Sequence, residues 1–218
     1  DNSWELEARP DTDFGLTNYQ GFQETFADSK GRIWFETRMG GPLYWDSKLK
    51  KSRKISLAKM GIILDYAEDS EGNIWMATDG YGIAYLDIKN DSIHGFNWPE
   101  NKSKTVKERF MTFVQTTDGS FWLGSYGDGL HQFNPKTKTY VKKIKHEKGN
   151  PNSLCSNIIR DICDDGKGGL WLATKEGLSY YNTIENTFKN YDMQDGLPSN
   201  NLRTLIFDKE GFLWIGTI

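Results

Sequence analysis

The sequence has few of the residues that mark metal-binding, redox or membrane-spanning proteins. Two of its 218 residues are cysteines, and Cys155 and Cys163 have neither metal-type nor redox-type spacing, so we expect two unpaired small residues. No apolar run approaches the roughly 18 residues of a membrane-spanning helix. Lys and Arg together number 27 against 30 Asp and Glu. This balance gives no broad basic field, so we expect no nucleic-acid partner.

Signatures of catalysis are equally scarce. The sequence contains no G-x-S-x-G, no H-E-x-x-H and no clustered His/Cys set. The three histidines, His94, His131 and His146, are scattered along the chain. Almost every Asp lies where a turn is expected, so no acid/base pair stands out. We expect no catalytic residue, no metal and no cofactor in this chain.

Glycines and aromatic residues are abundant, and many of them belong to one repeated motif. Aromatics make up 14% of the chain and there are 22 glycines, which is typical of a β protein with many tight turns. The motif D-x-x-G-x-[ILF]-W, or a close variant, occurs five times, about 40 to 50 residues apart. The copies end at Trp34, Trp75, Trp122, Trp171 and Trp214. Repetition at this spacing indicates a solenoid, a propeller or an array.

Each copy of the motif predicts a unit of four strands. A short apolar run predicts the first strand, the Asp/Gly cluster predicts a hairpin turn, and the tryptophan lies on the second strand. A Gly-rich turn, a third strand ending in an aromatic plus Asp or Asn, and a more polar fourth strand follow. The predicted first strands are Phe22–Ala27, Ile62–Ala67, Phe110–Gln115, Ile158–Cys163 and Leu202–Phe207. No segment shows sustained helical periodicity.

Four antiparallel strands in some 45 residues correspond to one blade of a β-propeller. The sequence therefore predicts an all-β fold: a single β-propeller domain with about four complete four-stranded blades and a partial fifth. The approximate blades are 20–58, 59–105, 106–150, 151–195 and 196–218. The five tryptophans are then structural, because each ring fills the gap between two blades, rather than forming an exposed platform for sugars.

The full pattern D-x-x-G-x-[ILF]-W-[ILMF]-[GA]-[ST], followed by G-[IL]-x-x-[YF]-[DN], resembles the two-component regulator propeller repeat. The phrases between blades, residues 149–157 and 195–200, resemble that family too. The first copy departs most, with Phe35-Glu36-Thr37 after its tryptophan. The resemblance implies the periplasmic sensor region of a bacterial hybrid two-component system, often one that responds to oligosaccharides. It also implies a transmembrane kinase in the full-length protein, although this chain has no phosphoacceptor-histidine motif and no ATP-binding signature.

The repeats do not complete a ring. An outer strand is expected near Trp4–Ala8, and the fifth copy stops at Ile218 after two strands. Propellers of the family that the repeats resemble usually have seven blades. We therefore expect this chain, which begins at Asp1 without a methionine, to be part of a longer protein whose other residues complete the propeller. An open stack of blades exposes the apolar face of its terminal blade, so a homodimer stays open as an alternative.

Candidate ligand-binding residues lie in loops at one face of the predicted propeller. Loops that join second to third strands share this face with loops that lead into first strands, and such loops vary without disturbing the core. Charged, amide and aromatic groups around a funnel suit a sugar. The candidates are Arg38, Met39, Asp79, Tyr81, Tyr126, Asp128, Lys175 and Glu176, joined by Trp98, Asn152, Asn157, Asn200 and Asn201. The alternative is that these are ordinary turn residues.

Two aligned positions on the first strands form a second group of candidates. Ten residues before each tryptophan the residue is always polar: Glu24, Asp65, Thr112, Asp161 and Thr204. One residue earlier stand Gln23, Leu64, Met111, Arg160 and Arg203. A polar side chain inside an apolar strand needs a partner or a wet channel. The pattern predicts either a hydrogen-bond ring lining the hub or a ring that binds an anionic or hydroxylated ligand at the channel mouth.

Three functional classes follow from these observations. A ligand-binding sensor propeller is favoured. Some propellers with similar blades are lyases for cyclic antibiotics, so a lyase acting on a small cyclic or carbohydrate substrate is the alternative, with His131 as the residue to test. The third class is a propeller that binds a protein strand or loop on one face.

Overall fold

The chain folds into antiparallel four-stranded sheets that follow one another along the sequence. The structure, a computed structural model, describes residues 22–37, 41–55, 62–87, 90, 92–96 and 109–218.

The first sheet contains β1 (Phe22–Ala27), β2 (Arg32–Thr37), β3 (Gly41–Asp46) and β4 (Lys51–Lys54). The second contains β5 (Ile63–Glu68), β6 (Ile74–Thr78), β7 (Ile83–Asp87) and β8 (Ser92–Phe96). The third contains β9 (Phe110–Gln115), β10 (Phe121–Ser125), β11 (Leu130–Asn134) and β12 (Thr139–Ile144). The fourth contains β13 (Ile159–Asp164), β14 (Gly169–Thr174), β15 (Gly177–Asn182) and β16 (Thr187–Tyr191). A 3-10 turn, η1 (Met193–Asp195), precedes the two-stranded sheet of β17 (Leu202–Phe207) and β18 (Leu213–Thr217).

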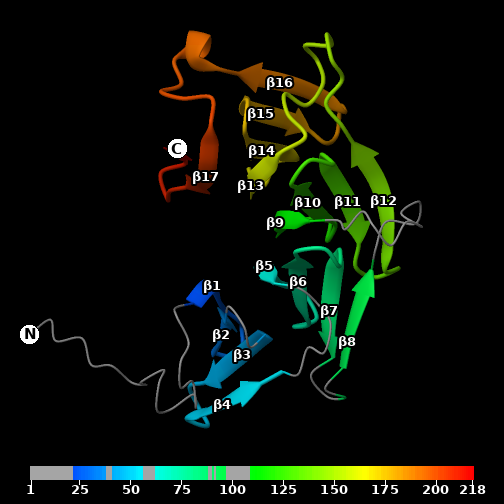
Figure 1. Ribbon diagram of the computed structural model, residues 1–218, viewed down its shortest axis with the longest axis vertical. Helices are drawn as coiled ribbons and strands as arrows, with labels where there is room; N and C mark the ends of the chain where they lie inside the picture. Colours follow the sequence, from blue (N-terminus) through cyan, green and yellow to red (C-terminus); the bar gives the residue numbers. More distant parts are fainter. Residues whose placement is uncertain (1–21, 38–40, 56–61, 88–89, 91, 97–108) are drawn as a thin grey trace, which may run out of the picture.

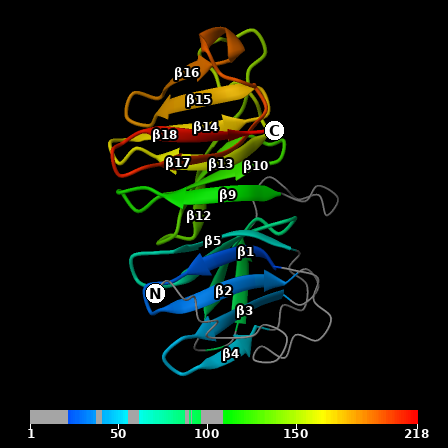
Figure 2. The same ribbon diagram turned by 90° about the vertical axis from the view of Figure 1, so that its left-hand side faces the viewer.

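The sheets stand side by side in an arc, like blades around a hub. The first strand of each sheet, β1, β5, β9, β13 and β17, lies on the concave side, and the fourth strands β4, β8, β12 and β16 lie on the convex side (Figure 1). Figure 2 looks onto the concave side, where these first strands cross the view one above another. This is the arrangement of blades in a β-propeller.

The sequence predicted the strands closely. Three of the five first strands have the predicted bounds, while β5 and β13 begin and end one residue later than expected. Such differences are within the usual uncertainty of strand ends. The predicted outer strand near Trp4–Ala8 lies outside the described residues.

The repeated motif is a hairpin turn closed by its own aspartate and tryptophan. In the second copy, Asp69 Oδ1 accepts hydrogen bonds from the backbone N–H groups of Glu71 (3.0 Å) and Asn73 (2.9 Å). Its other oxygen, Oδ2, accepts one from Trp75 Nε1 at 2.8 Å. Gly72 has a φ of 79°, in the left-handed region that glycine adopts without strain. The aspartate therefore fixes the turn and orients the indole of the second strand.

The same indole bond recurs in other copies and holds several carboxylates in their charged form. Trp34 donates to Asp28 at 2.8 Å, and Trp214 donates to Asp208 at 2.7 Å. Burial raises the pKa of Asp28 and Asp69, but hydrogen bonds from the indoles and neighbouring N–H groups outweigh it and lower the pKa overall. The indole hydrogen bond is the main cause that lowers the pKa of Asp208.

We expect the propeller to lose stability in acid through these turns. A carboxyl whose pKa is lower folded than unfolded stabilises the fold above its unfolded pKa of about 3.9, and that contribution is lost as pH falls through its folded pKa. The melting temperature, followed by circular dichroism, should be constant from pH 7 to 5 and fall steadily from about pH 4 downward. The Asp69→Asn variant should be less stable than the parent at pH 7, with a smaller difference at pH 3. An equal difference at both pH values would contradict this explanation.

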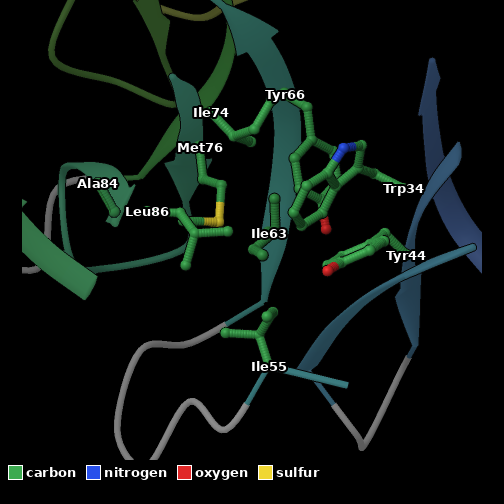
Figure 3. Close-up of a cluster of buried hydrophobic side chains, with 9 residues drawn as sticks. All are labelled: Trp34, Tyr44, Ile55, Ile63, Tyr66, Ile74, Met76, Ala84 and Leu86. Atoms are coloured by element: carbon green, nitrogen blue, oxygen red, sulfur yellow. The ribbon is translucent and has the colours of Figure 1, made fainter. Parts of the chain in front are cut away.

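The first three tryptophans of the motif each pack against the sheet that follows their own. Trp34, 0% exposed, lies on β2 and contacts the second sheet, where Tyr66 is one of its neighbours (Figure 3). Trp75 packs edge-on against Phe121 and Phe133 of the third sheet, with ring centroids 5.3 and 5.5 Å away. Trp122 packs against the fourth sheet in the same way, and its nearest aromatic ring is that of Tyr181, at 5.5 Å. These three rings form the core between neighbouring blades.

The last two tryptophans differ from the expected wedge between blades. Trp171 is only partly buried, although it packs against the apolar cluster of the fourth and fifth sheets that includes Leu202 and Leu205, and it is stacked on Tyr191 at 5.9 Å. Trp214 is 62% exposed, so the prediction that it is buried between two blades does not hold within this chain. The physical reason is that no described sheet covers the face of β17 and β18 on which Trp214 lies. Phe212 and Ile206 of the same hairpin are exposed as well.

The hub alternates between two kinds of cross-strand pair from the second blade onward. Asp65 pairs with Ala77, and Asp161 pairs with Ala173. In the third blade Thr112 pairs with Gly124, and in the fifth Thr204 pairs with Gly216. A Cβ on Gly216 would lie 2.6 Å from Thr204 Cγ2, and one on Gly124 would lie 3.1 Å from Thr112 Cγ2. The threonine methyl therefore takes the space that the alanine Cβ has in the Asp–Ala pairs.

Candidate functional site: the hub cavity

The first strands line a polar cavity of about 580 Å³ at the hub. Its walls come from the beginnings of β5, β9, β13 and β17, which gather at one end of the hub because successive blades repeat the same strand direction. The lining residues are Ile63, Leu64, Asp65, Arg109, Met111, Thr112, Arg160, Asp161, Arg203 and Thr204. The volume is within the range of about 300–1,000 Å³ that is usual for small-ligand sites.

Both aligned positions from the sequence therefore reach the cavity, from four successive blades. Leu64, Met111, Arg160 and Arg203 represent one position, and Asp65, Thr112, Asp161 and Thr204 the other. The side chains of Gln23 and Glu24, from the first blade, lie outside the described part of the structure.

Asp161 joins the fourth blade to the fifth. Its Oδ2 accepts a hydrogen bond from the backbone N–H of Leu205 and another from the hydroxyl of Thr204, both at 2.8 Å. Its Oδ1 accepts from the N–H of Ile162 at 2.9 Å and from the hydroxyl of Thr112 at 3.4 Å. An ionised carboxylate has about four acceptor positions, and these four donors fill them.

Asp65 has the corresponding role between the second and third blades. Its Oδ1 accepts from the N–H of Tyr66 at 2.8 Å, and its Oδ2 accepts from the N–H of Phe113 at 2.9 Å. The two aspartates thus hold neighbouring first strands together. From the second blade to the fifth, hydrogen bonds at the Asp and Thr positions link neighbouring first strands, as the structural alternative predicted for these blades.

Three arginines supply the positive charge of the cavity. Arg160 Nη1 donates to Asn201 Oδ1 at 2.5 Å and to the backbone oxygen of Leu202 at 3.0 Å, which are both uncharged acceptors. Arg109 Nε lies 3.5 Å from Asp79 Oδ1, and its guanidinium stacks over the ring of Tyr126 at 4.9 Å. Arg203 is exposed, and within the described ranges no hydrogen bond or ion pair engages its guanidinium.

The predicted site residues differ in their place relative to the cavity. Arg160 and Arg203 line the cavity, and Asp79 and Tyr126 contact Arg109 at its edge. The other predicted loop residues, Tyr81, Asp128, Lys175 and Glu176, are not part of its lining. Arg38, Met39 and Trp98 lie outside the described residues. That any of these side chains binds a ligand stays a prediction.

Asp128 belongs to an ion-pair cluster of its own. Lys143 and Lys145 of the same blade both pair with its carboxylate, and His131 Nε2 lies 3.5 Å from Asp128 Oδ2. Burial raises the pKa of Asp128, but the hydrogen bonds from His131 and the two lysines outweigh it and hold the pKa well below its usual range. The carboxylate of Asp128 is thus engaged within its own blade.

The asparagines before the first strands have structural partners. Asn157 Oδ1 accepts from the N–H of His146 at 2.7 Å, and Asn200 Oδ1 accepts from the N–H of Met193 at 2.8 Å. Asn201 holds Arg160, as described above. Asn152 is exposed in the same kind of loop. These contacts support the interpretation of the asparagines as ordinary turn residues. Asn201 is the exception, because it also positions Arg160 of the cavity.

The histidine considered for a catalytic role is buried away from the cavity. His131 is 0% exposed and packs edge-on against Phe110 and Tyr140, at 4.9 and 6.1 Å between ring centroids.

Burial raises the pKa of both cysteine thiols. Over the described ranges, no three His, Cys, Asp or Glu side chains are placed to hold a metal ion. In the same part of the chain, no helix has the length and apolar character needed to span a bilayer.

Sequence reasoning missed Arg109, which enters the cavity from the third blade. It stands two residues before Met111, the aligned position of that blade, so the alignment on tryptophan gives no signal for it. The only local signal is its place just before a first strand, at the same end as the predicted loops.

Fold and hub together define the class of protein: radiating four-stranded blades around a polar central cavity make a β-propeller. Residues 153–176 and 196–218 match the family model of the two component regulator propeller, so the resemblance is confirmed, and the matched stretches contain the fourth and fifth motifs. A curated relative, histidine kinase P4 of Formosa agariphila, is 24% identical over 158 residues, which are 70% of this chain and 12% of that protein.

Solved structures show the same fold. An extracellular domain described as that of a hybrid two component system from B. thetaiotaomicron superposes with a TM-score of 0.74 at 22% identity, covering 93% of this chain and 26% of that chain. Virginiamycin B lyase from Staphylococcus aureus superposes with a TM-score of 0.68 at 13% identity, covering 91% of this chain and 64% of the lyase. The chain therefore spans a small part of the kinase and about a quarter of the extracellular domain.

Proposed function

We propose that this chain is part of the extracytoplasmic, periplasmic sensor propeller of a hybrid two-component system and that it responds to oligosaccharides. The observation that carries the proposal is the hub cavity, where charged and hydroxyl groups from four blades face one space. Ligand sites of this kind combine apolar surface with a few placed polar groups, and here Leu64 and Met111 provide the apolar surface.

The comparisons support the signalling context of this proposal. The matched family model, the extracellular domain from B. thetaiotaomicron and the histidine kinase of Formosa agariphila all concern two-component signalling. In the proposed assembly, the remainder of the propeller and a transmembrane kinase are partners in the full-length protein. Ligand binding in the hub would be passed to the kinase, which feeds the phosphorelay.

A lyase reaction has less support. The fold is similar to that of a lyase, but histidine is absent from the described residues that line the hub cavity, and His131 is buried between aromatic rings. A propeller that binds only a protein partner is the remaining class, and the experiment below separates it from the sensor.

A thermal-shift screen of the full chain tests the proposal. A ligand that binds only the folded state stabilises it by about 2.7 kcal/mol at a hundred times its Kd. For a chain of this size that corresponds to an increase in Tm of roughly 5–10 °C. We expect at least one oligosaccharide in a panel of neutral and acidic plant and animal glycans to give such an increase, without turnover of the glycan. The proposal fails if no oligosaccharide raises Tm, and turnover would favour the lyase.

A further inference from the structure

The cavity is asymmetric in chemistry from one side of the arc to the other. On the β5 and β9 side, Leu64 and Met111 present apolar surface. On the β13 and β17 side, the same aligned position carries Arg160 and Arg203. Arg109, just before β9, adds a third guanidinium at the rim. At this aligned position the cavity is therefore apolar on the β5 and β9 side and cationic on the β13 and β17 side, while Arg109 adds a positive charge on the β9 side.

The two aspartates of the cavity lining bond to neutral donors rather than to the arginines. Asp161 accepts four hydrogen bonds from backbone N–H and hydroxyl groups, and Asp65 accepts two from backbone N–H groups. Their oxygens are used to join the blades. Arg109 contacts Asp79 and Tyr126, and Arg160 contacts Asn201 and Leu202, rather than either of these aspartates.

The arginines retain N–H donors that no described acceptor engages. Each guanidinium has five N–H donors in a planar fork. Arg160 uses Nη1 on two uncharged oxygens, and Arg109 has a 3.5 Å contact with Asp79 at its Nε. Arg203, which is exposed, adds a guanidinium without a described partner. All three arginines line the same space of about 580 Å³.

We propose that the hub cavity binds an acidic oligosaccharide, with a carboxylate or sulfate of the sugar held by Arg160 and Arg203 and with Arg109 at the rim. The proposal rests on the proposed sensor function and narrows it to a ligand class. Guanidinium forks match the geometry of carboxylate and sulfate oxygens, and charge-assisted bonds of this kind are stronger than neutral ones. The apolar C–H face of the same sugar ring packs against Leu64 and Met111.

The test compares ligands of different charge, and trigalacturonate and its methyl ester form the closest matched pair. Isothermal titration calorimetry on the full chain uses trigalacturonate, its fully methyl-esterified form, a sulfated chondroitin tetrasaccharide and neutral cellotetraose as probes. We expect an acidic probe to bind, the uncharged probes to bind at least about tenfold more weakly, and the acidic affinity to fall as salt rises from 50 to 300 mM. Trigalacturonate carries carboxylates alone, whereas the chondroitin probe carries both carboxylates and sulfates, so binding of the chondroitin probe alone would point to sulfate as the group that is bound.

Variants locate the site. Arg203→Gln is the main variant, because its side chain has no described partner whose loss would disturb the fold, and it should weaken acidic-probe binding by about tenfold. The affinity of Arg203→Lys, which keeps the charge but not the planar guanidinium, should lie between those of the parent and Arg203→Gln. Lys209→Gln is the matched control: it removes one positive charge from the exposed turn at the other end of the same hairpin and should leave the affinity unchanged.

Three outcomes are decisive. Acidic probes that bind preferentially and lose affinity in Arg203→Gln, but not in Lys209→Gln, support the site. Neutral probes that bind as tightly as acidic ones, or equal affinity in Arg203→Gln, overturn the acidic site and leave the sensor function standing. No binding by these probes or by any glycan of the wider screen overturns both.

Discussion

Replacing Trp75 by alanine should lower the free energy of unfolding by about 3–5 kcal/mol, the usual cost of removing a buried aromatic side chain. Trp75 is 1% exposed and packs against Phe121, Phe133 and Tyr85, so its removal opens a cavity between the second and third blades. It also leaves Asp69 without its indole donor. Urea unfolding followed by far-ultraviolet circular dichroism gives the measurement.

The matched control is Trp214→Ala, which removes the same residue from the same motif. Trp214 makes the same indole bond, to Asp208, but it is 62% exposed, so the cost should be about 1 kcal/mol or less. Trp75→Phe separates the two contributions at the buried site, because it keeps most of the apolar area and removes only the N–H donor. Equal losses for Trp75→Ala and Trp214→Ala would show that the interface between blades is not the source of the stability.

The second large effect is expected at Asp161. Asp161→Ala removes the acceptor for the N–H groups of Ile162 and Leu205 and for the hydroxyl of Thr204. Leaving partly buried donors without a partner costs about 1–3 kcal/mol, and the loss should fall mainly on the contact between the fourth and fifth blades. Amide hydrogen exchange, read by mass spectrometry, should show faster exchange in β17 before the other first strands change.

Asp164→Ala is the control for this position. Asp164 ends the same strand, and its side chain accepts a hydrogen bond from the N–H of Gly166 in an exposed turn, so its loss should cost little. Asp161→Asn keeps one acceptor oxygen and should give an intermediate loss. If β17 exchanges at the parent rate in Asp161→Ala, then the carboxylate is not what joins these two blades.

Local pattern was enough to predict the blades but not the site in full. The strands follow from short apolar runs, the Asp/Gly turns and the spacing of the tryptophans, which are all local features. The two hub positions could also be predicted from the sequence, because they recur at a fixed distance before each tryptophan. Arg109 could not be found this way, since its place at the cavity depends on how the third blade sits beside the fourth. The exposure of Trp214 likewise depends on what packs on its sheet, which its own motif does not encode.

The partners of each hub aspartate could not be read from the sequence either. Asp65 and Asp161 bond to the next first strand through backbone N–H groups, and backbone donors leave no trace in residue identity. The threonine hydroxyls could be guessed as partners, but their alternation with aspartate becomes meaningful only beside the cross-strand pairs.

That alternation gives the hub a parity. From the second blade to the fifth, Asp–Ala and Thr–Gly pairs take turns, so the smallest unit that repeats around the hub is two blades rather than one. Removing one blade would place two identical hub residues next to each other: without residues 106–150, Asp65 would lie beside Asp161. A strict alternation closes only in a ring with an even number of blades. A ring with an odd number must contain a seam, and the first blade, with Glu24 where a threonine would continue the series, breaks the pattern.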